Sequence, residues 1–367
     1  MKRFEKVAVV ACILSAMVCL PARADFAKLY VFGDSLSDDG NVYTLTGGAF
    51  PPSPPYAQHF SNGPVAVDRL ANILGISLLP STAGGKNYAV GGATTGTANF
   101  LTTEFPPLTP ALNNTGMQTQ VNTFTAARPA FDPSTTLFVL WGGPNDFLLS
   151  PTPATAAQAV TNLTNEIVAL ESVGARNFLV PNMPDLSITP FGRSLTAEQQ
   201  LGLQQLSLGF DAGLDHALAA VRAGSPPGVD IVGFNTLGAL NALLANPSAF
   251  GLSNVTDPCF NGVSVCGDPD QYLFWDTVHP TAHVHDILGT EFAAAVPEPQ
   301  TGWLVGIGFL IVVGWPRMAA VIDCSDNGAE SQPRTTKIRS RTSSMLPLPS
   351  TFRYFGARES PVSAQAE

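Results

Sequence analysis

The stretch that decides the fold is LYVFGDSLSDDGNV, residues Leu29–Val42. An apolar run leads directly into Gly-Asp-Ser and then into a polar turn with Gly40 and Asn41. This pattern predicts a buried strand that ends in a tight loop, which presents the hydroxyl of Ser35 at the carboxyl edge of a sheet. Open α/β sheets bind ligands at that edge. Ser35 is therefore a candidate nucleophile if a base and oxyanion donors exist elsewhere, although an ordinary turn explains Gly-Asp-Ser equally well.

Similar short apolar runs recur along the chain, each bounded by Gly, Pro or Asn. They predict strands at residues 137–141, 177–181 and 229–234, and amphipathic stretches between them predict helices at 157–173 and 196–223. Continuous apolar runs of this length are typical of strands that are buried on both faces. The alternation of strands and helices predicts an α/β domain, in which helices cover both faces of a parallel sheet.

Two other stretches are rich in Pro, Gly, Thr and Asn. Residues 44–64 and 93–135 lack a clear apolar period, and we expect them to form long loops. On a compact α/β body, long loops often act as lids or as walls of a binding site.

The amino end has the pattern of a secretory signal peptide. A basic start, MKRFEK, leads into the apolar run Val7–Leu20 and then into Ala22-Arg23-Ala24. This run is shorter than the ~20 residues that span a bilayer. We therefore predict that residues 1–24 direct export through the Sec route and are removed after Ala24, with a retained membrane anchor as the alternative.

The carboxyl end carries a second unusual segment. Pro297-Glu298-Pro299 precedes an apolar run at 301–315, and Pro316-Arg317 follows it. Residues 296–317 resemble the PEP-CTERM sorting signal of Gram-negative bacteria, which an exosortase-type enzyme removes during export. The resemblance implies a cell-surface or extracellular protein that contacts the membrane through 301–315 before processing. The alternative is a plain carboxyl-terminal anchor.

The segment that follows departs from the sorting pattern, because such signals usually end the chain. Residues 318–367 are rich in Ser, Arg, Thr and Pro, and we predict that this atypical tail is disordered. Between the two ends, residues 25–295 have the length of one α/β domain with a substantial core.

The composition excludes some classes of function. The formal net charge is −10, and no basic cluster stands against it, so nucleic-acid binding is not expected. Of five cysteines, Cys259 and Cys266 alone fall within 25–295, and in an exported protein they predict a disulfide, with two free buried thiols as the alternative. No CxxC pair or zinc-ligand spacing occurs, so we expect neither a metal nor another cofactor.

Groups that carry chemistry gather in four blocks. The first is GDSLSDDGN around Ser35. The others are GKNYAVGGATT (residues 85–95), LWGGPNDF (140–147) and YLFWDTVHPT (272–281).

In this order the four blocks resemble the GDSL or SGNH hydrolase family of esterases and lipases. Longer matches at residues 60–75, 174–190 and 246–260 extend the resemblance over most of 28–285. The resemblance implies a flavodoxin-like, three-layer α/β/α sandwich of about five parallel strands. It also implies hydrolysis of an ester substrate through a serine.

The resemblance assigns the catalytic groups. Ser35 matches the nucleophile and His279 the general base, a role that suits imidazole because its ordinary pKa lies near working pH. Asp276, three residues before His279, is expected to reach the ring and fix its tautomer.

The resemblance also assigns the oxyanion donors. They are the amide of Ser35, the amide of Gly92, with Gly91 as the alternative, and the side-chain amide of Asn145. We expect Asp34 and Asp146 to support this site rather than to react.

The substrate stays open at this stage. A carboxylesterase or lipase that acts on acyl chains, an O-acetyl esterase that acts on exopolysaccharide, and an acyltransferase all fit the four blocks. A non-catalytic surface protein of a biofilm matrix is the alternative from a different class. The chain has no G-x-S-x-G elbow, which disfavours the ordinary α/β-hydrolase arrangement.

Overall fold

The computed structural model describes residues 26–296. The predicted signal peptide (1–24), nearly all of the sorting segment and the tail lie outside these residues. Within residues 26–296, no helix combines the length and apolar character that a bilayer crossing demands.

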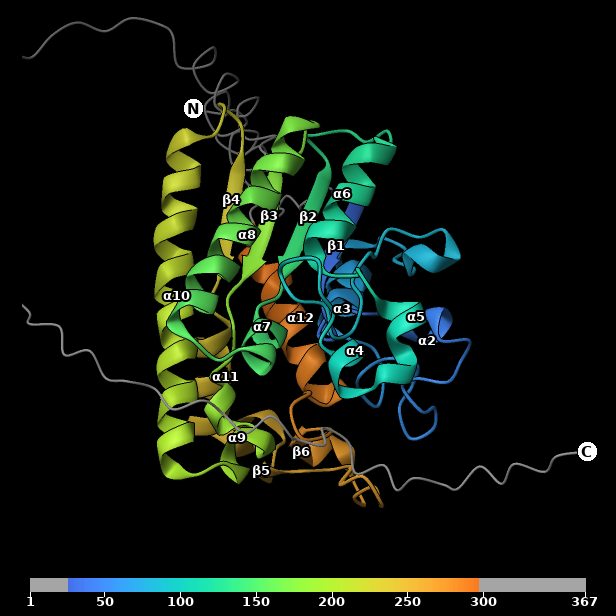
Figure 1. Cartoon of the computed structure of the whole chain (residues 1–367), viewed down its shortest axis with the longest axis vertical. Helices are drawn as coiled ribbons and strands as arrows, with labels where there is room; N and C mark the ends of the chain where they lie inside the picture. The colour runs from blue at the N-terminus through green and yellow to red at the C-terminus, as the bar shows by residue number, and fades with distance from the viewer. Residues whose placement is uncertain (1–25, 297–367) are drawn as a thin grey trace, which may run out of the picture. The chain divides into compact units, whose positions relative to one another are not determined.

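A four-stranded parallel sheet forms the centre of the domain (Figure 1). Its strands are β1 (Lys28–Gly33), β2 (Thr136–Trp141), β3 (Asn177–Pro181) and β4 (Asp230–Phe234), and they lie side by side in that order. All four strands predicted from the apolar runs are confirmed. Because every strand runs in the same direction, their carboxyl ends meet at one edge of the sheet.

The fifth position in the sheet is filled by an irregular segment at residues 86–90. The amide of Val31 donates to Lys86, and the amides of Tyr88 and Val90 donate to carbonyls of β1. Only Asn87 pairs with β1 as an isolated parallel bridge, so the segment is not a regular strand. The expected number of about five strands therefore corresponds to four strands and this edge segment.

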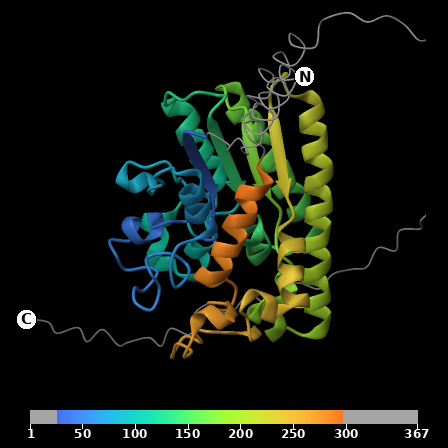
Figure 2. The ribbon, with the colours of Figure 1, turned by 180° about the vertical axis from the view of Figure 1, so that it is seen from behind.

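Helices cover both faces of the sheet, as the alternation predicts. On one face Phe32, Phe138 and Phe178 pack against α6 (Met117–Ala127), α8 (Pro153–Ser172) and α10 (Ala197–Gly224). On the other face Val31, Val139 and Leu179 pack against α3 (Ala66–Leu74), α11 (Thr236–Ala245) and α12 (Ala282–Ala295). Figure 2 shows this second face, with α12 in orange across the sheet. The expected three-layer α/β/α sandwich is confirmed.

The helix predicted at 196–223 has a clear start. The side chain of Thr196 accepts a hydrogen bond from the amide of Gln199, and the Gln199 side chain accepts one from the amide of Thr196. Such a capping box satisfies two amides that the first helical turn leaves unpaired. The predicted helix at 157–173 begins four residues earlier, at Pro153.

The prediction of a continuous loop at 93–135 is wrong. This stretch contains α4 (Leu101–Glu104), α5 (Thr109–Leu112) and α6. Met117, Val121 and Phe124 are buried one turn apart on α6, but Thr, Gln and Asn separate them and weaken the apolar period. The predicted loop at 44–64 has no regular element after α2 (Asn41–Leu45).

The remaining elements are short. They are the helices α7 (Pro144–Leu149) and α9 (Pro190–Ser194), the strands β5 (Asn254–Pro258) and β6 (Tyr272–Phe274), and the 3-10 turns η1 (Ser81–Ala83), η2 (Pro106–Leu108), η3 (Leu186–Ile188), η4 (Pro247–Phe250) and η5 (Pro269–Gln271).

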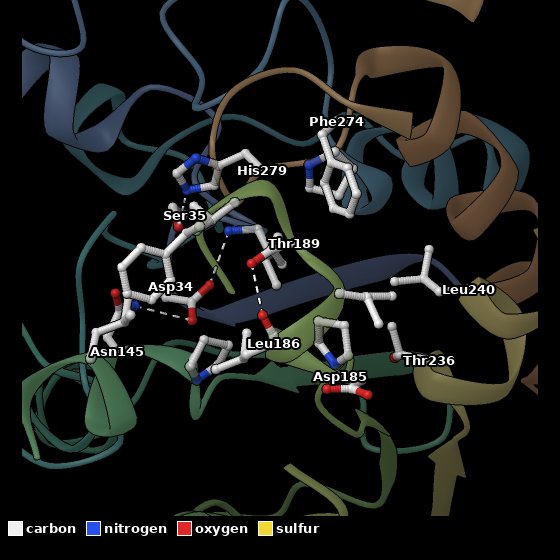
Figure 3. A pocket seen from close by; sticks show the side chains of 18 of the residues that line it. Asp34, Ser35, Asn145, Asp185, Leu186, Thr189, Thr236, Leu240, Phe274 and His279 are labelled. Carbon is white, nitrogen blue, oxygen red and sulfur yellow. Dashed lines mark hydrogen bonds between the residues drawn. The ribbon is translucent and has the colours of Figure 1, made fainter. Parts of the chain in front are cut away.

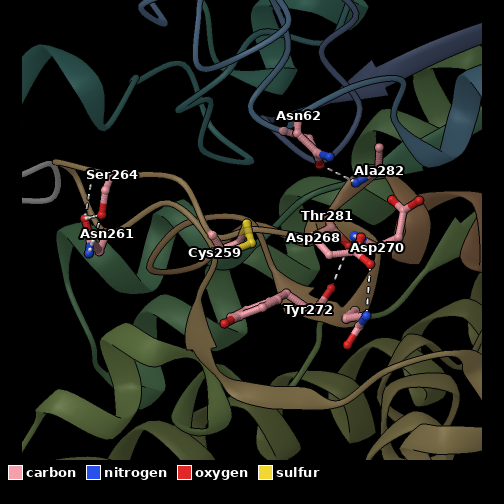
Figure 4. The surroundings of a disulfide bond; sticks show 12 residues. Asn62, Cys259, Asn261, Ser264, Asp268, Asp270, Tyr272, Thr281 and Ala282 are labelled. Atoms are coloured by element: carbon pink, nitrogen blue, oxygen red, sulfur yellow. Dashed lines mark hydrogen bonds between the residues drawn. A yellow bond between two sulfur atoms is a disulfide. The ribbon is translucent and has the colours of Figure 1, made fainter.

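The predicted disulfide is present. Cys259 and Cys266 are joined just after β5, which pairs with β6 in a separate two-stranded parallel sheet (Figure 4). The bond closes a short loop whose base packs on Tyr56 and Trp275.

Candidate active site

Ser35, His279 and Asp276 form a continuous hydrogen-bonded chain. The Oγ of Ser35 lies 2.8 Å from Nε2 of His279 (Figure 3). The other ring nitrogen, Nδ1, lies 2.8 Å from Oδ2 of Asp276 and 3.0 Å from Oδ1. A neutral imidazole held in this way keeps its proton on Nδ1 and accepts the serine proton at Nε2. The structure thus brings together the three predicted catalytic side chains from two distant blocks.

The loop that carries Asp276 also orients its carboxylate. Its Oδ1 accepts hydrogen bonds from the amides of Val278 and His279, at 2.9 and 2.8 Å. Burial raises the pKa of Asp276, but the charge and side-chain hydrogen bond of His279, together with these amides, outweigh burial and leave the pKa below its ordinary value. The carboxylate is therefore ionised and able to stabilise an imidazolium beside it.

A tight turn after β1 places Ser35. The carbonyl of Asp34 accepts the amide of Asp38, and its side-chain Oδ1 accepts the amide of Leu36 at 2.9 Å. Gly33 is required before the turn, because a Cβ there would lie 2.5 Å from the carbonyl oxygen of Trp141. Any other residue at position 33 would push β1 away from β2 beside this turn.

The two glycines of the second block differ in how their amides are used. The amide of Gly91 donates to Oδ2 of Asp38 at 2.8 Å. Among residues 26–296, the amides of Gly92 and Ser35 donate no hydrogen bond. Gly92 also has a φ of 78°, and a Cβ there would lie 2.4 Å from Oδ1 of Asn99. This difference favours Gly92 over Gly91 as the oxyanion donor.

Asn145 stands at the start of α7 and joins the first and second blocks. Its Nδ2 donates to the carbonyl of Ala93 at 3.0 Å and to Oδ2 of Asp34 at 3.3 Å. Asp34 therefore accepts donors from the nucleophile turn and from Asn145. Burial raises the pKa of Asp34 to about 7, although the Leu36 amide and the His279 charge oppose the shift.

Asp146 holds the loop that follows the glycines. Its two oxygens accept the amide and the hydroxyl of Thr95, at 2.9 and 2.8 Å. Burial raises its pKa to about 6, because the two bonds from Thr95 offset only part of the desolvation. Asp34 and Asp146 thus bind the loops around Ser35, and their supporting role in the reaction stays a prediction.

A pocket opens beside the serine and runs between the carboxyl edge of the sheet and α11. It is narrow, with a cavity volume of about 40 Å³. Ser35, Asn145 and His279 lie at one side of it, and Thr236 and Leu240 at the other (Figure 3). Most of its wall is apolar and includes Leu36, Trp141, Leu148, Leu186, Ile188, Phe191, Leu240, Phe274, Val278 and Leu288.

The prediction missed two aromatic residues of the 44–64 loop. The hydroxyl of Tyr56 donates to Oδ2 of Asp276 at 2.8 Å. The ring of Phe60 lies 5.3 Å from that of His279 and occupies the space that a Cβ on Gly91 would need. Phe60 opens one of the matching stretches, at 60–75, but the resemblance assigned no role to it, and Tyr56 lies outside them all.

Within residues 26–296, no group of three or more His, Cys, Asp or Glu side chains is arranged to hold a metal ion. The groups at the site are those of proton transfer and oxyanion binding, and together they can activate a hydroxyl toward a carbonyl carbon.

Comparison with known proteins identifies relatives. The model of the GDSL-like Lipase/Acylhydrolase family matches residues 29–292. The Phosphatidylcholine-sterol acyltransferase of Aeromonas hydrophila is 27% identical over 77% of this chain and 93% of its own length. Esterase EstA of Pseudomonas aeruginosa is 32% identical over 74% of this chain, which spans only 47% of that relative. A crystal structure of a lipolytic protein of the G-D-S-L family from Veillonella parvula aligns with 13% identity and a TM-score of 0.40, over 73% of this chain and 96% of its own.

Proposed function

The chain belongs to the GDSL-like lipase/acylhydrolase family, and we propose that it hydrolyses carboxylic esters through an acyl-enzyme on Ser35. The observation that carries this proposal is the 2.8 Å contact between Oγ of Ser35 and Nε2 of His279. With Asp276 on the opposite ring nitrogen, the hydroxyl already faces its base.

In the first step Oγ of Ser35 attacks the carbonyl carbon while Nε2 of His279 takes the hydroxyl proton. Asp276 stabilises the imidazolium that forms. The amides of Ser35 and Gly92 and the side chain of Asn145 donate to the developing oxyanion. Asn145 exchanges its longer bond, the 3.3 Å contact with Asp34, for this interaction.

The tetrahedral intermediate then collapses, and the alcohol leaves with the proton from His279. A water molecule takes the place of the alcohol, gives its proton to His279 and attacks the acyl carbon. The second collapse releases the carboxylic acid and returns the proton to Ser35. All atoms are accounted for without a cofactor.

The apolar wall of the pocket supports an acyl chain of several carbons as the substrate group. Each methylene that the pocket buries contributes about 0.8 kcal/mol. An acetyl group would contact little of this apolar lining, and this supports an acyl ester or lipid over an O-acetylated sugar. If an alcohol replaces water in the second step, the product is a new ester, and the name of the Aeromonas hydrophila relative supports this second candidate function.

We propose in addition that the protein is exported. The signal-like residues 1–24 and the disulfide support an oxidising compartment outside the cytoplasm, and the 296–317 segment supports sorting to the cell surface by an exosortase-type enzyme.

A fluorophosphonate probe tests the nucleophile, with p-nitrophenyl butanoate turnover beside it. The wild type should react with both, Ser35→Ala with neither, and His279→Ala should stay folded but lose turnover. Ser37→Ala is the matched control and keeps labelling. Labelling of Ser35→Ala at the wild-type level would refute the assignment, and an unlabelled, inactive wild type would favour the non-catalytic surface protein.

The pH profile tests the base. Turnover should fall in acid, because a protonated His279 cannot accept the serine proton. A flat profile from acid to neutral pH contradicts that role. Added alcohol separates the two candidate functions, since an acyltransferase would divert the acyl group from acid to ester.

A further inference from the structure

Tyr56 reaches the site from a position 220 residues away from Asp276 in the chain. We infer that Tyr56 is a positioning residue for the reaction proposed above: its hydroxyl holds the Asp276 carboxylate so that His279 faces Ser35. This inference rests on the proposed function for its kinetic effect, but the contact itself can be measured separately.

The hydrogen bonds of Asp276 show what Tyr56 adds. Oδ1 accepts the amides of Val278 and His279, which belong to the same turn as Asp276. Oδ2 faces both Nδ1 of His279 and the hydroxyl of Tyr56, each at 2.8 Å. Among the described residues, Tyr56 is the one hydrogen-bond donor to this carboxylate from outside the 276–279 turn.

This donor matters because Asp276 is only 3% exposed. Little water can replace a lost partner at such a site, so the remaining protein donors determine how the carboxylate is oriented. Both carboxylate oxygens lie within 3.0 Å of Nδ1, so a small rotation would exchange them. The bond from Tyr56 to Oδ2 opposes this rotation.

The ring of Tyr56 is itself held firmly. It is 2% exposed and packs edge-to-face on Phe260 and Trp275, with ring centroids 5.7 and 6.0 Å away. The amide of Phe260 donates to the carbonyl of Trp275, and Cys259 ties the same loop through the disulfide. The hydroxyl therefore approaches Asp276 from a fixed direction.

Neighbouring residues bind the same catalytic loop. The hydroxyl of Ser61 donates to the carbonyl of Pro280 at 2.9 Å. The side chain of Asn62 accepts the amide of Ala282 at 2.8 Å, as Figure 4 shows. Residues 56–62, which we call the clamp, thus lie along residues 276–282 and contact them at several points. Within the clamp, Tyr56 is the residue that touches a catalytic side-chain oxygen.

The Tyr56→Phe variant tests the inference because it keeps the ring and removes the hydroxyl. We expect kcat/KM for p-nitrophenyl butanoate to fall about tenfold, the loss typical of a missing hydrogen bond to a charged group. The acidic limb of the pH profile should move to higher pH, since a carboxylate with one donor fewer holds the imidazolium proton more strongly.

Two controls separate positioning from general packing. Tyr272→Phe removes a hydroxyl from the same aromatic cluster, away from Asp276, and should leave rate and pH profile unchanged. Ser61→Ala removes the hydrogen bond from the clamp to Pro280, and it should lower the melting temperature without moving the acidic limb of the pH profile. In an Asp276→Asn background, Tyr56→Phe should cause no further loss of kcat/KM.

Equal losses in the wild-type and Asp276→Asn backgrounds would overturn the inference, as would an unchanged rate and pH profile in Tyr56→Phe. The proton NMR signal of the His279 Nδ1–H gives a readout without turnover. It should shift in Tyr56→Phe and stay in place in Tyr272→Phe. A signal unchanged in Tyr56→Phe refutes the contact even if the ester chemistry is correct.

Discussion

Leu240 offers a direct test of the acyl pocket. It lies on α11, on the side of the pocket away from Ser35, and is 3% exposed. Leu240→Trp should fill that end of the pocket and shorten the chain that it accepts. Short esters should still react, because the groups around Ser35 stay untouched.

The expected preference for longer acyl chains follows from burial against the apolar wall. Four methylenes separate an octanoyl from a butanoyl ester, and full burial of each contributes about 0.8 kcal/mol, or about 3 kcal/mol in total. The wild type should therefore prefer octanoate by up to about two hundredfold in kcat/KM. In Leu240→Trp the octanoate-to-butanoate ratio of kcat/KM should fall to about one, because the four additional methylenes of octanoate stay in water.

The assay is a series of p-nitrophenyl esters from acetate to decanoate, below the concentration at which they aggregate. Leu244→Trp is the matched control: it makes the same change on the same helix, at a half-buried position outside the pocket wall. Melting temperatures of both variants show whether the added ring disturbs the core, since overpacking costs about 1–3 kcal/mol. An unchanged octanoate-to-butanoate ratio in a folded Leu240→Trp, or a wild-type ratio of one, would refute an acyl chain in this pocket.

Two further predictions concern stability. Both oxygens of Glu166 are buried without a hydrogen-bond partner within residues 26–296, and burial, followed by the nearby Asp146, raises its pKa well above the ordinary 4.5. The stability that protonated Glu166 contributes is thus full below pH 4.5 and is lost as pH rises through the folded pKa. In urea unfolding, Glu166→Gln should therefore gain stability over the wild type as pH rises from 5 to 8. A constant difference in the free energy of unfolding between the two proteins contradicts this. Replacing Cys259 and Cys266 by Ser should cost about 2–3 kcal/mol in the same assay, and an equal loss in wild type under reducing agent confirms the cause.

Much of the sheet could be predicted because its strands are buried on both faces. A run such as that at 137–141 has no polar residue to interrupt it, so it stands out from its surroundings. Helix α6 did not stand out, because Thr, Gln and Asn fill the positions between its buried apolar residues. The signal from three buried apolar side chains in eleven residues was too weak to distinguish this helix from a loop.

Some residues of the site could likewise be predicted from the sequence, and others could not. Ser35 and His279 lie in blocks whose order is specific, so their pairing could be predicted across 244 positions. The structure adds an argument on Gly91 and Gly92 that the sequence could not give, since it shows that Asp38 accepts the amide of Gly91. Tyr56 could not be predicted, because a tyrosine in a proline-rich loop gives no sign of its partner until the fold brings Asp276 beside it.

The long separation between hydroxyl and imidazole also bears on the order in which the protein matures. A growing chain displays Ser35 early, yet the proton acceptor is among the last residues of the domain to be synthesised, just before α12. Every shorter fragment therefore carries a serine of ordinary, low nucleophilicity. Under the function proposed above, reactivity toward esters therefore requires the complete domain, because a chain that ends before residue 279 carries Ser35 without its base.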